Sequence, residues 1–180
     1  MSTAFAVGRL PVILALIGLL TLQPAHAQRP DRQLPVNIEA DSVLVDDRNK
    51  THTFEGNVIL SQGSLMIRGE KLVVLQGADG FQTGIATGGA DGLARFRQQR
   101  AGSQEHIEGE AERIEYDSRT EQAKLFNRAL VRSGGDEVRG HYIEYDAITE
   151  NYTARSQPSA TGQDGRVRAV IQPRGSAAAD

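Results

Sequence analysis

The 180-residue chain contains no cysteine and no tryptophan, and each absence excludes a class of site. Without cysteine, neither a disulfide framework nor a thiolate metal site can form. Aromatic residues make up only 5% of the chain, whereas carbohydrate sites depend on exposed aromatic rings, above all tryptophan. The formal net charge is −3 and no basic cluster stands out, so the composition predicts no nucleic-acid partner.

Catalytic motifs are missing as well. The sequence has no G-x-S-x-G elbow, no P-loop and no zinc-protease motif. His52, His106 and His141 lie far apart, and none has a second ligand at helical or strand spacing. We interpret each as a surface or packing residue rather than a metal ligand or general base. The sequence therefore predicts no metal site and no cofactor.

The acidic run "EHIEGEAERIEYD" (105–117) is the remaining candidate for catalysis. Paired carboxylates of the glycosidase kind could come from Glu108, Glu110, Glu112 and Asp117. These acids fall mostly at alternate positions, as expected for the solvated face of a strand. We therefore predict that the protein is not an enzyme.

The first residues have the pattern of an export signal. Arg9 supplies a positive charge, and the apolar run "LPVILALIGLL" (10–20) and then "AHA" (25–27) follow it. This order predicts export with cleavage after Ala27. A retained membrane anchor is the alternative, but a spanning helix needs about 20 apolar residues and this run is shorter. We expect one domain over 28–173 and a disordered tail over 174–180.

The second half of the chain repeats the first. With a shift of 71 residues, the segment 39–74 aligns on 110–145 without a gap. Apolar positions match even where identity fails, and the tetrapeptide IEYD, at 114–117 and 143–146, marks a shorter unit inside the repeat. The identical pairs include Glu39/Glu110, Ala40/Ala111, Asp46/Asp117, Gly63/Gly134, Arg68/Arg139 and Gly69/Gly140. Repetition on this scale indicates stacked supersecondary units of one kind.

These units have the pattern of strands. Apolar and polar residues alternate over 52–61 and 123–133, so each strand should bury one face. Glycine-containing breaks predict turns at 62–64, 77–80, 88–92 and 133–135. An all-β chain can close into a barrel, pack as two sheets or stack as an open-ended roll. The repeat favours a stack of about ten or more antiparallel strands with almost no helix.

Two positions interrupt the alternation. The apolar parity changes between Ile67 and Leu72 and again between Val138 and Ile143. A change of parity requires a bend or a bulge, and we expect one near Gly69 and one near Gly140.

The expected inward face combines large apolar residues with small ones such as Gly56, Ala123 and Ala129. One interpretation is an ordinary β core. The other is an apolar trough that its own side chains fill incompletely and that accepts acyl chains. The pattern alone leaves both interpretations open.

Three stretches carry a family resemblance. They are "FEGNVILSQGSLMIRGEK" (54–71), "VRGHYIEYD" (138–146) and "GRVRAVIQP" (165–173). The chain resembles, over about 36–173, the OstA-like family of periplasmic lipopolysaccharide-transport proteins. The resemblance implies a slightly twisted antiparallel β-jelly-roll, V-shaped in section and open at both ends. It also implies a location in the periplasm.

The resemblance further implies a role and a set of partners. The protein would carry lipopolysaccharide from the inner-membrane extraction complex to the outer-membrane receptor, with the lipid A acyl chains in an apolar groove. Its partners would be the inner-membrane component LptC, the outer-membrane receptor LptD and further copies of itself joined head to tail. The same module occurs in both membrane partners, but the expected cleavage site argues against the first and the short length against the second. A structural or carbohydrate-binding β-domain of the cell envelope stays the alternative.

Two sets of residues follow from this resemblance as hypotheses. The groove interior would be lined by Phe54, Val58, Leu60, Ile67, Leu72, Val74, Phe96, Ile114, Tyr116, Leu125, Val131, Val138, Ile143 and Tyr145. End-to-end assembly would use the first and last strands, at Val36, Ile38, Val43, Val167, Val170 and Ile171. Unpaired strand edges invite pairing with another chain, and joining unlike ends gives an open filament.

Overall fold

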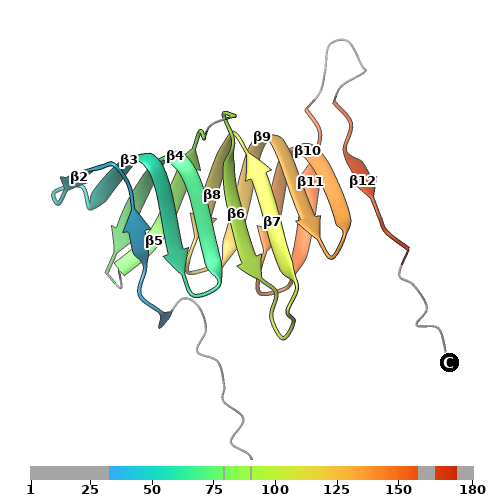
Figure 1. Cartoon of the computed structure of the whole chain (residues 1–180), viewed down its shortest axis with the longest axis horizontal. Helices are drawn as coiled ribbons and strands as arrows, with labels where there is room; N and C mark the ends of the chain where they lie inside the picture. The colour runs from blue at the N-terminus through green and yellow to red at the C-terminus, as the bar shows by residue number, and fades with distance from the viewer. Residues whose placement is uncertain (1–32, 79, 90, 158–164, 174–180) are drawn as a thin grey trace, which may run out of the picture.

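A computed structural model describes residues 33–157, except 79 and 90, together with 165–173 (Figure 1). The expected signal sequence, the cleavage site after Ala27 and the tail 174–180 lie outside the described residues. Within them the chain forms twelve strands, all paired antiparallel in one continuous sheet. The predicted all-β class with ten or more strands is therefore confirmed. No helix in this part of the chain has the length and hydropathy to span a membrane.

The strands differ in length, and four of them are long. The long strands are β3 (Thr51–Gln62), β4 (Leu65–Gly77), β9 (Gln122–Ser133) and β10 (Asp136–Asp146). The short strands are β1 (Asn37–Glu39), β2 (Ser42–Asp46), β5 (Gly80–Thr87), β6 (Ala94–Gln99), β7 (His106–Ala111), β8 (Arg113–Asp117), β11 (Asn151–Arg155) and β12 (Arg168–Val170). The turns between β3 and β4, β4 and β5, β5 and β6, and β9 and β10 lie where the glycine-containing breaks predicted them.

Each long strand belongs to two layers. The first half of β3 pairs with β2 and its second half with β1, and β4, β9 and β10 divide in the same way between two partners. One layer therefore contains β1, β6, β7 and β12, and the other contains β2, β5, β8 and β11. Figure 1 shows these layers one behind the other, with the N-terminal strands at one end and β11 and β12 at the other.

In the described part of the chain, the backbone crosses between the layers along one side only. The long strands cross between the layers there, and the connections from β1 to β2, from β5 to β6 and from β7 to β8 cross there too. We call this side the spine. On the opposite side, which we call the mouth, the layers end in hairpin turns. Among the described strands, no ladder joins the two layers across the mouth.

The chain bends at the spine through a pair of residues with positive φ. In β3 they are Gly56 (84°) and Asn57 (50°), and the register with β4 shifts there. In β9 they are Asn127 (61°) and Arg128 (49°), and the register with β10 shifts between Gly140 and Tyr142. The predicted irregularities are confirmed, but the extra residues lie in β3 and β9, opposite the glycines that marked them in the sequence.

Gly69 and Gly140 are required for a different reason, the close approach of a neighbouring strand. A Cβ atom on Gly69 would lie 2.9 Å from the carbonyl oxygen of Thr87. A Cβ atom on Gly140 would lie 3.0 Å from the carbonyl oxygen of Arg155. Both contacts are with backbone, which cannot move aside without breaking its ladder, so each position excludes any larger residue.

Positions 71 residues apart make the same contacts at the spine. The backbone N–H of Asp41 donates to the Gly56 carbonyl (3.0 Å), and that of Glu112 donates to the Asn127 carbonyl (3.1 Å). The carboxylate of Asp41 also accepts a bond from the side chain of Asn57, and that of Glu112 accepts one from the side chain of Arg128, 71 residues later. The spine is thus built twice with the same local geometry.

Each copy of IEYD ends in an aspartate that begins a turn, and Asp46, which ends VLVD (43–46), does the same. Asp46, Asp117 and Asp146 each accept hydrogen bonds from backbone N–H groups two or three residues later. Each turn then closes with a residue at positive φ, namely Lys50, Glu121 and Glu150. Aspartate suits this place because its side chain can imitate a backbone turn. The tetrapeptide recurs because the mouth needs the same hairpin each time.

Candidate functional site

Inward side chains form three continuous rows between the layers. The first row comprises Ile38, Leu60, Ile67, Phe96, Gly109, Val131, Val138 and Ala169. The second comprises Val43, Phe54, Leu72, Ala86, Ile114, Leu125, Ile143 and Ala154. The third comprises Val45, His52, Val74, Gly84, Tyr116, Ala123, Tyr145 and Tyr152. Each row runs from one end of the stack to the other and is almost wholly apolar.

The residues predicted to line a groove all face this interior. All of them lie on the three rows except Val58, which lies beside Leu60 near the bend of β3. All are buried except Phe54, which is partly buried against the core. The structure therefore brings the whole predicted set together. Whether these side chains contact lipid stays a prediction.

The interior is filled by its own rings. The Phe96 ring occupies the place above Gly109, where an added Cβ would lie only 2.0 Å from the ring. Phe96 also stacks with Tyr145, with ring centroids 6.1 Å apart. Burial raises the pKa of the Tyr145 hydroxyl to about 12. In this conformation the protein has a closed core rather than an open groove.

Leu130 and His52 depart from the simple alternation of buried and exposed side chains. By the alternation over 123–133, Leu130 falls on the wetter face, opposite the outward Glu110 and Arg139, yet it is buried. His52 was interpreted as a surface or packing residue. It is half-buried on the third row, and its Nε2 atom is buried without a hydrogen-bond partner. Its parity with Phe54 was the signal that could have placed it inside.

The mouth is held by a polar contact near its C-terminal end. Arg100, in the β6–β7 loop of one layer, donates to Glu150 in the β10–β11 turn of the other at 2.6 Å. The backbone N–H of Ala101 donates to the second oxygen of Glu150 at 3.1 Å. The hydrogen bond from Arg100 lowers the pKa of Glu150 below its usual range. We call these contacts the latch.

The N-terminal end of the mouth contains a cavity instead. Its volume is about 480 Å³, and it lies between β1 with the segment before it and the first half of β3. Gln62 is buried at its edge and donates a hydrogen bond of 3.0 Å to the carbonyl oxygen of Leu34. That bond fixes the segment before β1 as one wall of the cavity.

The acidic run lies on the outer surface and in a turn, paired with arginines. Its contacts are Glu108–Arg97 (3.5 Å), Glu110–Arg132 (3.0 Å), Glu112–Arg128 (2.8 Å) and Asp117–Arg119 (3.2 Å). The hydrogen bond from Arg128 lowers the pKa of Glu112. Among the described residues, no group of three or more histidine and acidic side chains could hold a metal ion. The solvated-face interpretation of these carboxylates is confirmed.

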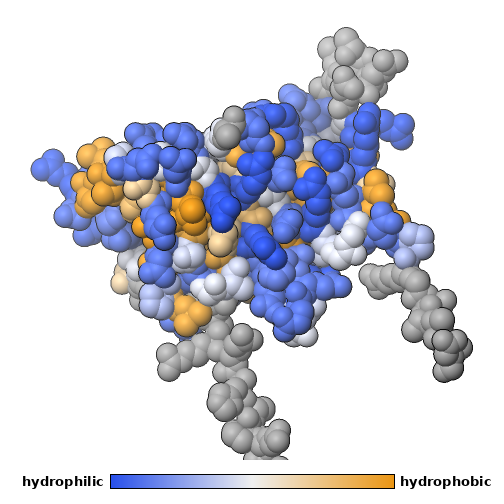
Figure 2. Space-filling view, viewed as in Figure 1, coloured by the Kyte–Doolittle hydropathy of each residue, from blue (hydrophilic) through white to orange (hydrophobic). Residues whose placement is uncertain are grey.

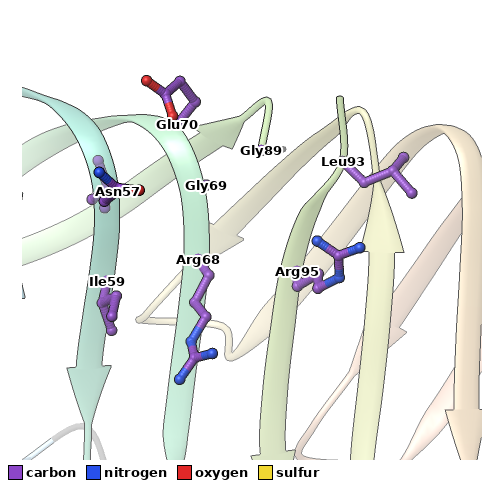
Figure 3. A pocket seen from close by; sticks show the side chains of 9 residues that line it. Asn57, Ile59, Arg68, Gly69, Glu70, Gly89, Leu93 and Arg95 are labelled. Atoms are coloured by element: carbon purple, nitrogen blue, oxygen red, sulfur yellow. The ribbon is translucent and has the colours of Figure 1, made fainter. Parts of the chain in front are cut away.

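A depression of about 420 Å³ lies on the outer face below the spine, where β4 turns away from β6 (Figure 3). Arg68 on β4 and Arg95 on β6 lie directly opposite each other beside it. Arg95 pairs with Asp91 and, at 4.0 Å, with Glu110. This depression lies outside the layers and is separate from the interior rows.

The two ends of the stack expose hydrophobic side chains. Figure 2 shows orange patches near β2 and near β12, with a mostly hydrophilic face between them. Val43 is 55% exposed, Val170 is 53% exposed and Ile171 is 76% exposed. Val167 is also exposed, whereas Val36 and Ile38 are half-buried against the core. The residues predicted for assembly therefore lie at the two ends, but their part in assembly stays a prediction.

Comparisons with known proteins agree with this geometry. The family described as LptA/(LptD N-terminal domain) LPS transport protein matches residues 37–151. Lipopolysaccharide export system protein LptH of Pseudomonas aeruginosa is 27% identical over 170 residues, 93% of this chain and 96% of its own. Lipopolysaccharide export system protein LptA of Escherichia coli K12 is 29% identical over 136 residues, 76% of this chain and 72% of its own.

A solved structure has the same fold. It is the crystal structure of LptH, the LptA-homologous periplasmic component of the lipopolysaccharide transport device of Pseudomonas aeruginosa. It superposes with a TM-score of 0.70 at 26% identity, covering 79% of this chain and 99% of that one.

Proposed function

This chain belongs to the lipopolysaccharide transport family formed by LptA and the N-terminal domain of LptD, and we propose that it is the LptA-type periplasmic bridge. It carries lipopolysaccharide from the inner membrane toward the outer membrane. The observation that supports this role best is the set of three inward rows that run uninterrupted between two exposed apolar ends. Its relatives are named as export proteins, and its function is transport rather than catalysis.

The rows match the physical problem that such a bridge must solve. Each methylene group left in water costs about 0.8 kcal/mol, so a lipid with many acyl carbons cannot cross the periplasm unaided. Side chains such as Leu60, Leu72 and Leu125 offer an apolar surface at every step along the stack. Because the apolar surface is nearly uniform, the apolar contacts hold the lipid about equally at each step. Direction must therefore come from the partners.

Lipid can enter only if the layers part. The interior side chains are buried in the closed form, and no ladder between the described strands crosses the mouth. The spine, with its two matched bends, keeps the layers joined while the mouth widens. The acyl chains then lie between the layers, and the saccharide and phosphates of the lipid stay in water outside the mouth.

The exposed ends supply the connections. β1 and β2 present one pair of edges, and β11 and β12 present the other, so a second copy adds head to tail and continues all three rows. By the same geometry one end joins the inner-membrane component LptC and the other joins LptD. The apolar side chains at the ends, among them Val43 and Ile171, are buried when the copies join.

A photocrosslinking experiment with matched phenylalanine positions tests the transport role. The photoreactive analogue p-azidophenylalanine is placed at Phe54 or at Phe96, both inward, and at Phe126 on the outer face. Phe126 is a suitable control because it packs under Arg113, 4.1 Å from its ring centroid, outside the interior. We expect lipopolysaccharide to be captured at the inward positions, to be displaced by lipid A and not to be captured at Phe126. Equal capture at all three positions, or none in a folded β-rich protein, contradicts the proposal and favours a structural envelope domain.

A further inference from the structure

We propose that the cavity at the N-terminal end of the mouth is a subsite for the neutral linkage of an acylated lipid, with His52 as its hydrogen-bonding residue. The ligand group is the amide, ester or hydroxyl where an acyl chain meets its headgroup. The proposal rests on the transport role proposed above. It names one place in the interior where a hydrogen bond recognises the linkage of the lipid, in addition to the apolar contacts that shield its acyl chains.

The first argument is the unpaired imidazole nitrogen. Within the part of the chain that the structure describes, His52 Nε2 is the one buried side-chain nitrogen or oxygen without a hydrogen-bond partner. Such an atom costs stability, because it gave up its bonds to water on folding. His52 lies between Val45 and Val74 on the third row, and neither of these two side chains can offer it a hydrogen bond.

The second argument is the contrast with the matching position of the repeat. The residue 71 positions after His52 is Ala123, which is fully packed at 1% exposure. The residue that matches Val74 is Tyr145, whose ring fills the interior there. The fold therefore accepts a small apolar residue at this place and needs no histidine for its structure. A buried imidazole beside a cavity is best explained by a ligand.

The third argument is the character of the lining. The cavity walls combine apolar side chains, among them Val36, Ile38, Phe54, Val74 and Phe81, with four polar ones. The polar side chains are Gln33, His52, Gln62 and Gln76. No arginine or lysine lines it, so the site lacks the residues that most often bind a phosphate. Amide and imidazole groups over an apolar floor fit an amide, ester or hydroxyl carried on a hydrocarbon chain.

The test uses two probes that share a twelve-carbon chain. N-lauroylglucosamine joins its chain through a neutral amide, whereas dodecyl phosphate joins it to an anion, and both are used below their micellar concentrations. Binding is measured to the wild type and to two variants. His52→Val replaces the imidazole with an apolar side chain, and His141→Val is a histidine control at the spine. We expect His52→Val to weaken N-lauroylglucosamine about three- to tenfold, the worth of one hydrogen bond, and His141→Val to leave it unchanged. Dodecyl phosphate should bind all three proteins alike.

A spectroscopic readout makes the result independent of the variants. In wild-type protein labelled with ¹⁵N-histidine, N-lauroylglucosamine should shift the Nε2 resonance of His52 and leave that of His106 unchanged. If His52→Val does not fold, His52→Gln, which can still donate and accept, replaces it and should keep most of the affinity. Unchanged affinity in His52→Val together with a silent Nε2 resonance overturns the proposal and assigns His52 to packing.

The failure of this inference differs from the failure of the transport role. If lipopolysaccharide is still captured at Phe96 but His52 neither shifts nor affects the amide probe, the transport role holds and the subsite is wrong. If p-azidophenylalanine at Phe96 captures no lipopolysaccharide even with His52 unchanged, the transport role itself is wrong.

Discussion

The two ends of the mouth are built on the same repeat but differ in how firmly they close. At the N-terminal end, Phe54 is only partly buried and a cavity of about 480 Å³ lies beside it. At the C-terminal end its counterpart Leu125 is fully buried, and the latch between Arg100 and Glu150 joins the layers. The spine, by contrast, makes equivalent contacts in both halves. The two halves of the repeat are therefore alike at the spine but differ at the mouth. The N-terminal end of the mouth is loosely packed, and its C-terminal end is held shut by the latch.

The largest expected loss of stability comes from a substitution in the closely packed C-terminal half. Leu125→Ala removes a fully buried side chain and should cost about 3 kcal/mol of unfolding free energy, as core leucines do. Phe54→Ala, at the matching position, should cost less than about 2 kcal/mol because its ring is already partly exposed beside a cavity. Urea unfolding of both variants measures the difference. Equal losses would mean that the two ends are packed alike.

The next effect tests the claim that the spine is the same in both halves. Gly69→Ala and Gly140→Ala each place a Cβ about 3 Å from a backbone carbonyl oxygen, an overpacking that costs about 2 kcal/mol. We expect the two losses to agree within about 0.5 kcal/mol when measured by thermal or urea unfolding. A much smaller loss at one site would show that one bend is more adaptable than the other.

The latch should have a smaller effect on stability and a local effect on opening. Glu150→Gln removes the charge but keeps a similar shape, and the pair is about one third exposed on each side, so the loss should stay below about 1 kcal/mol. Hydrogen exchange should become faster in the 100–105 loop and in β11, while the β3–β4 turn at the other end stays unchanged. Faster exchange along the whole mouth would indicate that the latch holds both ends.

The latch also predicts a pH dependence. The pKa of Glu150 is lowered in the folded protein, chiefly by the hydrogen bond from Arg100. A lowered pKa means that the contribution is complete above the ordinary pKa of glutamate and is lost as the pH falls through the depressed value. We therefore expect the protection factors of the 100–105 loop, which are relative to the intrinsic exchange rate at each pH, to fall only in acid, and the Glu150→Gln variant to lack that fall. A fall that persists in Glu150→Gln would assign the pH dependence to another group.

Much of this architecture could be predicted from the sequence because it depends on local periodicity. The alternation places Leu60 and Leu125 on one face, and the parity changes locate the bends. Two features could not be predicted. Asn127 and Arg128 have positive φ, which residues other than glycine seldom adopt, and the latch joins Arg100 to a residue 50 positions away.

The burial of Leu130 and the unpaired nitrogen of His52 could not be predicted from the sequence for a related reason. Both depend on which side chains from other strands reach them, and a strand's own pattern does not contain that information. Parity gives the side of the sheet on which a residue lies. It does not give whether that side is covered, as it is at Leu130, or left with a cavity, as it is at His52.

The smallest effect on stability is expected at the two ends of the stack, where substitutions should change assembly rather than folding. Val170→Asp with Ile171→Asp changes side chains that are already exposed, so unfolding free energy should change by less than about 0.5 kcal/mol. Head-to-tail association should nevertheless weaken, because the two carboxylates would have to be buried against the β1–β2 end of the next copy. Sedimentation over a range of concentrations measures this, with Tyr142→Phe as a control on the outer face near the same end. Unaltered association would mean that β12 is not the joining edge, and β11, with Tyr152 still 40% exposed, becomes the edge to test.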